Sequence, residues 1–227
     1  MNTVSKKDLH HLENIPVVLE TGAARKALRA DRTGMPPEEM KALLERTRRL
    51  IAPQGWYRVV YVETRGKDSV EAGGVRFQSG LLNRNLADAE RIFPYVLTIG
   101  KTLEVEAAGV RDDLLLQYHL ETLGDLTLRL AMRGLEEHVR ESFGIEKLSS
   151  MSPGSLPDWP IEEQRPLFAL LGAGGPGSGP GVSLTDSLLM LPRKSLSGIL
   201  FPTEHTFIAC RLCPRPHCPS RIGDAPR

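Results

Sequence analysis

All three cysteines of the chain stand near its C-terminal end, in the run Cys210-Arg-Leu-Cys213-Pro-Arg-Pro-His217-Cys218. A CxxC pair places two thiolates on one ion, because the two intervening residues form a tight turn. Cys218 and one imidazole, from His217 or His205, complete a set of four ligands. Thiolates suit both zinc and an iron–sulfur cluster. The spacing therefore predicts a metal or cluster site formed by Cys210, Cys213, Cys218 and His217.

Two other interpretations of this run stay open. One is a redox-active dithiol, and the other is a tail of reduced thiols that becomes ordered only on a partner. Pro214, Pro216 and Pro219 keep the run out of a helix. Iron and sulfide analysis after anaerobic purification separates a cluster from both alternatives.

Composition and charge exclude several classes of function. The 227 residues carry a formal net charge of +1 and only 5% aromatic residues, so neither charge nor stacking surfaces indicate nucleic acid binding. No apolar stretch approaches the length of a membrane span. No apolar segment follows the first seven residues, so we expect no export signal, and an odd number of cysteines then favours the cytoplasm.

The elements that must position these residues indicate an α+β fold. Apolar periodicity and capping signals predict helices over 36–51 and 161–171 and a largely helical segment over 102–142, with Gly109, Gly124 and Gly134 as candidate breaks. A loop is expected over 149–160. Strands are expected over 57–63, 73–79, 95–99, 182–191, 195–201 and 206–210, with 73–79 pairing with 57–63.

Several segments resemble a known family. SPGSLPDWPIEEQ (152–164) is followed by GVSLTDS (181–187) and PRKSLSG (192–198). They resemble, in this order, the loop, helix and strands of the activation domain of cobalamin-dependent methionine synthase. Thr98-Ile99-Gly100 and the helix around Leu123-Gly124-Asp125 are similar to stand-alone members of that family. The resemblance covers roughly residues 75–202.

The resemblance implies a twisted antiparallel β-sheet flanked by helices and a division of the chain into three parts. Residues 1–74 form an N-terminal helix and strand region of the same domain. Residues 75–202 form the activation-domain-like core, with a Gly/Pro insertion at 172–181. Residues 203–227 form the cysteine-rich tail.

The family also implies ligand positions. In its usual loop, an arginine and a tyrosine stand where this chain has Ser150 and Ser155, and a glutamate stands on the long helix where an ungapped alignment places Arg129. These changes remove or reverse charges suited to the amino-acid end of S-adenosylmethionine. The positions implied to face this ligand are Ser150, Ser152, Pro153, Gly154, Ser155, Asp158 and Arg129. Arg193 and Lys194 fit either an anionic partner or simple solvation.

The function implied is that of an accessory protein in a corrinoid methyl-transfer system. In such a system, cob(II)alamin held by a partner protein is reduced by an electron donor and remethylated from S-adenosylmethionine. Whether the chain is itself part of a methyltransferase stays open. Two alternatives are an adaptor that keeps only the corrinoid-facing surface, and a metal-bearing or iron–sulfur interaction module.

Overall fold

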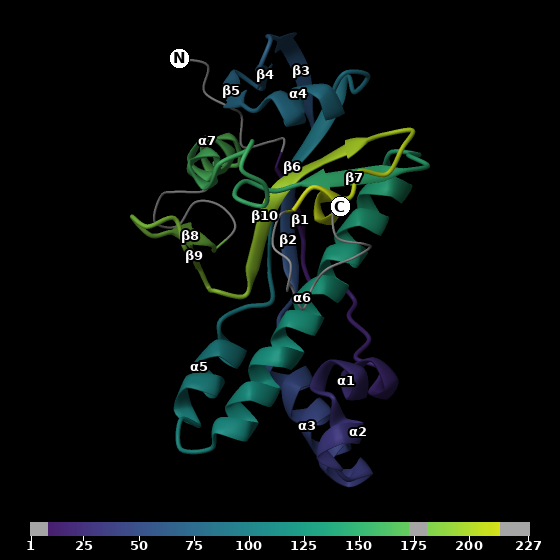
Figure 1. The fold of residues 1–227 in the computed structure, drawn as a ribbon, viewed down its shortest axis with the longest axis vertical. Coiled ribbons are helices and arrows are strands. Elements are labelled where there is room, and N and C mark those ends of the chain that lie inside the picture. Colours follow the sequence, from purple (N-terminus) through teal and green to yellow (C-terminus); the bar gives the residue numbers. More distant parts are fainter. Residues whose placement is uncertain (1–8, 173–180, 214–227) are drawn as a thin grey trace.

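The computed structural model describes residues 9–172 and 181–213. Figure 1 shows an elongated molecule in which a curled sheet lies toward one end and a group of helices lies at the other. All strand pairs are antiparallel. The expected α+β class, with an antiparallel sheet flanked by helices, is confirmed.

The centre of the sheet is β6 (Arg91–Thr98). β2 and β3 pair with successive parts of one of its edges, and β10 pairs with the other edge. β1 extends the sheet beyond β2, β7 beyond β10, and β4 and β5 beyond β3. The bounds are β1 Leu9–Leu12, β2 Gln54–Arg58, β3 Val60–Arg65, β4 Ser69–Ala72, β5 Val75–Gln78, β7 Leu148–Met151 and β10 Ser195–Pro202.

Both faces of β6 are covered. Because side chains alternate across a strand, Ile92 and Val96 enter one hydrophobic cluster while Phe93, Tyr95 and Leu97 enter another. The first cluster lies under α4 (Gly80–Asn85), the short 3₁₀ helix Ile161–Glu163 and α7 (Gln164–Leu170), and the second lies under the long helix α6 (Leu114–Ser142). This two-sided burial explains the continuous apolar run that marked the strand in the sequence.

The helix α6 joins the two ends of the molecule (Figure 1). Its second half packs Leu135 and Val139 on the sheet, whereas its first half packs Leu120 and Leu123 among other helices. We call that group of helices, with the first half of α6, the helical lobe. Its other members are α1 Thr21–Leu28, α2 Ala30–Thr33, α3 Pro37–Leu50 and α5 Thr102–Gly109.

Several expected elements need correction. The strand expected over 206–210 is wrong, since Ala209–Arg211 form a 3₁₀ turn. The expected strand over 182–191 is a hairpin of two short strands, β8 (Ser183–Leu184) and β9 (Met190–Leu191). β5 pairs with β4 and not with β3. The first residues of the expected loop, 149–151, belong to the strand β7. Gly124 and Gly134 lie inside α6 without breaking it.

The three-part division of the chain stays a prediction, although β4 and β5 pair across its first boundary. Among the described residues, no helix combines the length and the apolar composition that crossing a membrane would require.

Candidate functional site

The loop over 152–159 is held by its own hydrogen bonds. The Gly154 amide donates to the Trp159 carbonyl at 2.7 Å, and the Ser155 hydroxyl donates to the Ser152 carbonyl at 2.6 Å. Gly154 has φ +77°, a conformation that favours glycine. The indole of Trp159 is fully buried and meets the ring of Phe77 edge to face. The loop is therefore anchored at one end while Gly154 and Ser155 stay exposed.

Asp158, one of the implied ligand positions, has a structural role at the start of α4. Its carboxylate accepts hydrogen bonds from the Ser79 hydroxyl at 2.5 Å and the Leu81 amide at 2.7 Å. The hydrogen bond from Ser79 is the main reason why the pKa of Asp158 is lowered.

We expect Asp158→Ala to destabilise the fold by about 1–2 kcal/mol, the usual cost of a lost helix cap. Because the folded-state pKa of Asp158 is lowered, its contribution is present above the unfolded pKa and is lost as pH falls through the folded value. Urea unfolding of both proteins at pH 7 and pH 3 measures this, and the gap between them should shrink at pH 3. An unchanged gap would refute the assignment.

The loop also depends on a close approach between β7 and β10. Ser152 forms a side-chain hydrogen bond with Tyr95 of β6, and this contact passes over Gly198 of β10. A Cβ on Gly198 would overlap the carbonyl oxygen of Met151 and lie 2.8 Å from the Ser152 hydroxyl. Burial raises the pKa of Tyr95, so its phenol stays protonated and able to donate. Because Gly198 has no side chain, Met151 and Ser152 can lie this close to β10, and the loop begins from that position.

The loop shares a hollow with the cysteine tail. The hollow has a volume of about 370 Å³, and its lining combines loop residues with the start of the following helix and one cysteine. The lining residues are Gly154, Ser155, Leu156, Pro157, Pro160, Ile161, Glu162 and Cys213. The two features that stood out in the sequence thus meet at one place, and among the described residues of this lining Glu162 alone is charged.

The predicted metal site is only partly described. Cys210 and Cys213 lie at the 3₁₀ turn near the end of the described chain, whereas His217 and Cys218 lie outside the described residues. Within 9–172 and 181–213, no three His, Cys, Asp or Glu side chains are grouped to hold a metal ion, so His205 does not join the two described cysteines as a third ligand. The site with His217 and Cys218 stays a prediction.

A network of charged side chains, which the sequence did not reveal, lies at the other end of β10. Lys194 contacts Glu121 at 2.8 Å and Asp125 at 2.5 Å, and Arg193 contacts Glu104 at 3.1 Å and Glu121 at 2.7 Å. Simple solvation does not describe Lys194, whose side chain is only 11% exposed, whereas Arg193 is paired but still 54% exposed. An anionic partner for these residues stays a prediction. Their ion-pair partners are 69 to 89 positions away in sequence, so no local pattern shows them.

This network brings together segments that carried the family resemblance. Asp125 of the Leu-Gly-Asp segment binds Lys194 of PRKSLSG, and a Cβ on Gly124 would lie 3.3 Å from the Lys194 side chain. The Thr98 hydroxyl donates to the Lys194 carbonyl at 3.2 Å and accepts from the Ser195 hydroxyl at 3.0 Å. Burial alone would raise the pKa of Glu121, but hydrogen bonds from Lys194 and Arg193 outweigh it and lower that pKa.

The remaining expected ligand positions do not line the loop hollow. Ser150 lies in β7 opposite Leu200, and Pro153 is buried. Arg129 lines a different hollow, formed by α1 and the first half of α6. Glu136, two turns further along α6, is close enough to Tyr95 to influence its pKa. Burial raises the pKa of Glu136 itself.

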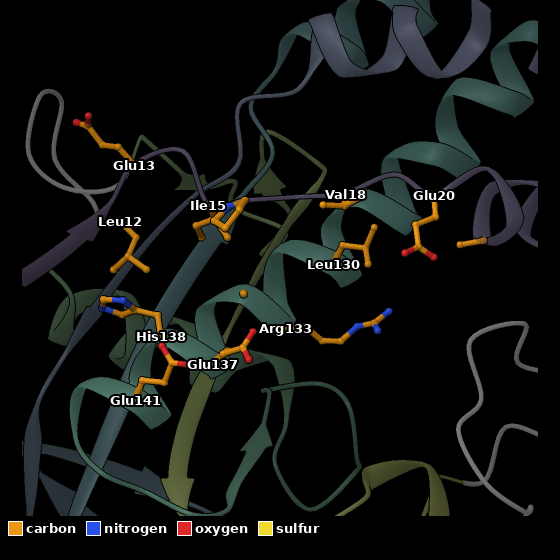
Figure 2. A pocket seen from close by; sticks show the side chains of 13 residues that line it. Leu12, Glu13, Ile15, Val18, Glu20, Leu130, Arg133, Glu137, His138 and Glu141 are labelled. Carbon is orange, nitrogen blue, oxygen red and sulfur yellow. The ribbon is translucent and has the colours of Figure 1, made fainter. Parts of the chain in front are cut away.

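A further hollow, about 790 Å³ in volume, lies between the N-terminal segment and α6 (Figure 2). Its lining combines an apolar floor that includes Ile15 and Leu130 with charged groups that include Glu20, Arg133 and Glu141. Sequence reasoning missed it, because the N-terminal segment has no motif that marks it as part of a cavity.

Comparisons with known proteins give a likeness of fold. No protein-family model and no curated protein matches the sequence. Similar solved structures include the reactivation domain of MetH bound to AdoHcy, with a TM-score of 0.48 and 15% identity. The alignment covers 89% of this chain and 81% of that one. The likeness concerns architecture, and it identifies no ligand or activity for this chain.

Proposed function

We propose that the protein is a cytoplasmic accessory of a corrinoid methyl-transfer system. It docks on a cobalamin-binding methyltransferase protein and supports the return of oxidised cobalt to its methylated state. The observation that carries the proposal is the convergence of the resembling segments. PRKSLSG contacts Thr98 and Asp125 at one end and the loop over 152–159 at the other. The segments that carry the resemblance are separated in sequence but contact one another in the fold.

In the proposed reaction, an electron donor reduces cob(II)alamin to cob(I)alamin, which then takes the methyl group from the sulfonium of S-adenosylmethionine. S-adenosylhomocysteine leaves, and methyl transfer draws the unfavourable reduction forward. The chain's contribution is orientation, because the cofactors carry the chemistry. The loop hollow, with exposed Gly154 and Ser155, is where we propose that the adenosine part lies.

The residues of this hollow predict weak binding. Ser150, which lies in β7 outside this hollow, cannot supply the guanidinium that the resemblance implies at its position, and the Ser155 hydroxyl is already bonded to the Ser152 carbonyl. Within the described part of the chain, no cation belongs to this lining, so the ligand carboxylate lacks a charged partner among those residues. The loss of two charge-assisted hydrogen bonds weakens binding by about a hundredfold or more.

Gly154 gives the sharpest test of the ligand site. A Cβ there would lie 2.7 Å from the Ile161 side chain and would narrow the hollow. We expect calorimetry to show weak, saturable binding of S-adenosylmethionine that Gly154→Ala abolishes. Gly74→Ala is the matched control, because Gly74 has a similar φ of +71° but open space around it. Equal loss in both variants would argue against this site.

A second candidate, the adaptor without a ligand, is favoured by the same lack of a cation in the described lining. Capture of a purified cobalamin-binding methyltransferase domain separates the two functions. Capture without any S-adenosylmethionine binding up to millimolar concentration supports the adaptor. Failure of capture would count against both, and would leave a metal-bearing interaction module, which iron, sulfide and zinc analysis of the full chain tests.

A further inference from the structure

A hollow in the helical lobe gathers positive charge. Its volume is about 610 Å³, within the range of ligand-binding cavities. Lys26, Arg29 and Arg129 line it from α1, from the residue after α1, and from α6. Ala23 and Ala27, with their short side chains, line it too.

The three cations are not used elsewhere in the described structure. Over residues 9–172 and 181–213, their side chains make no ion pair and no hydrogen bond, unlike neighbouring Arg25, which binds Asp31. Asp125 also lines the hollow, but Lys194 holds it at 2.5 Å and offsets part of its charge. The ion pairs of Arg193 and Lys194 join two cations to three carboxylates, so Asp125 is only partly offset and the hollow presents a net charge of about +2 to an incoming ligand.

Arg29 is exposed and ends α1 in a backbone conformation that favours glycine. Its φ is +53°, in the left-handed region, and helices commonly end there with glycine. Arginine costs more than glycine in this conformation. The chain thus has an arginine beside the hollow at a position whose backbone conformation favours glycine.

An aromatic ring completes the lining. Tyr118 is 51% exposed and borders the hollow with the hydroxyl of Thr122. Guanidinium groups suit phosphate oxygens, and an exposed ring offers a stacking surface for a planar group. We propose that this hollow binds a nucleotide, with the phosphate on Lys26, Arg29 and Arg129 and the base against Tyr118. The site is separate from the loop hollow, so it does not depend on the proposed function.

Calorimetry of the full chain with AMP, inorganic phosphate and adenosine tests the site. We expect AMP to bind best, phosphate more weakly and adenosine least, with AMP binding weakened by added NaCl. Arg129→Ala and Arg29→Gly should each weaken AMP binding about tenfold. Tyr118→Ala should weaken AMP binding and leave phosphate binding unchanged.

Arg29→Gly guards against a folding artefact, because glycine suits the backbone there and the variant should be at least as stable as the parent. Arg32→Ala, an exposed arginine of α2 outside the hollow, is the matched control. Absence of AMP and phosphate binding up to millimolar concentration would overturn the proposal. So would an equal loss of binding in Arg32→Ala, or adenosine binding as tightly as AMP.

Discussion

Gly198→Ala is expected to destabilise the protein by about 3 kcal/mol or more. The new methyl group would overlap the carbonyl oxygen of Met151 and press on the Ser152 hydroxyl, and a backbone atom yields less easily than a side chain. Relief requires β7 to move off β10, which breaks the pairing of Met151 with Ile199. Urea unfolding followed by circular dichroism measures the loss.

Gly109→Ala is the control for this substitution. Gly109 is the last residue of α5, and a Cβ there has no neighbour within 4 Å. Alanine is the better helix former by about 1 kcal/mol, so this variant should be as stable as the parent or more stable. Similar unfolding midpoints for Gly198→Ala and Gly109→Ala would contradict the steric argument.

Lys194→Met is expected to cost about 2–4 kcal/mol. The Lys194 side chain is only 11% exposed, and its ammonium lies between two carboxylates. Methionine keeps most of the volume, but the half-buried Glu121 then loses one of its two cations, and a charge left without its partner is costly. The double variant Lys194→Met, Glu121→Gln removes that charge and should recover part of the stability.

The same pair predicts a pH dependence. The folded-state pKa of Glu121 is lowered, so its contribution is present above the unfolded pKa of about 4.3 and is lost as pH falls through the folded value. In Lys194→Met, burial still raises the pKa of Glu121, but one of the two cations that lower it is gone. The stability lost between pH 7 and pH 3 should therefore be smaller in this variant than in the parent protein. Unfolding curves at pH 7 and pH 3 measure it. An equal pH dependence in both proteins would show that Lys194 does not set the pKa.

Helices with strong local signals could be predicted from the sequence. α3 begins at Pro37 and carries its apolar face on Met40, Leu43 and Leu44, as the 3.6-residue period indicated. The sequence of residues 206–210 could not by itself decide whether they form a strand. β-prone residues need a partner, and the two edges of β10 are already taken by β6 and β7.

The site was predictable only in part. The loop over 152–159 was marked by its resemblance to a family motif, and the structure places Cys213 beside it. The roles of Asp158 and Lys194 could not be derived, because each depends on partners about 70 or more positions away. Such contacts arise from how the sheet and α6 cross, and a local pattern does not encode that crossing.

The length of α6 has a consequence for how the protein unfolds. Its 29 residues extend for about 43 Å, and one half belongs to the core of the helical lobe and the other to the core beneath the sheet. Melting of either half exposes apolar side chains along a helix that the other core also needs. We therefore expect the two cores to unfold together as one cooperative unit.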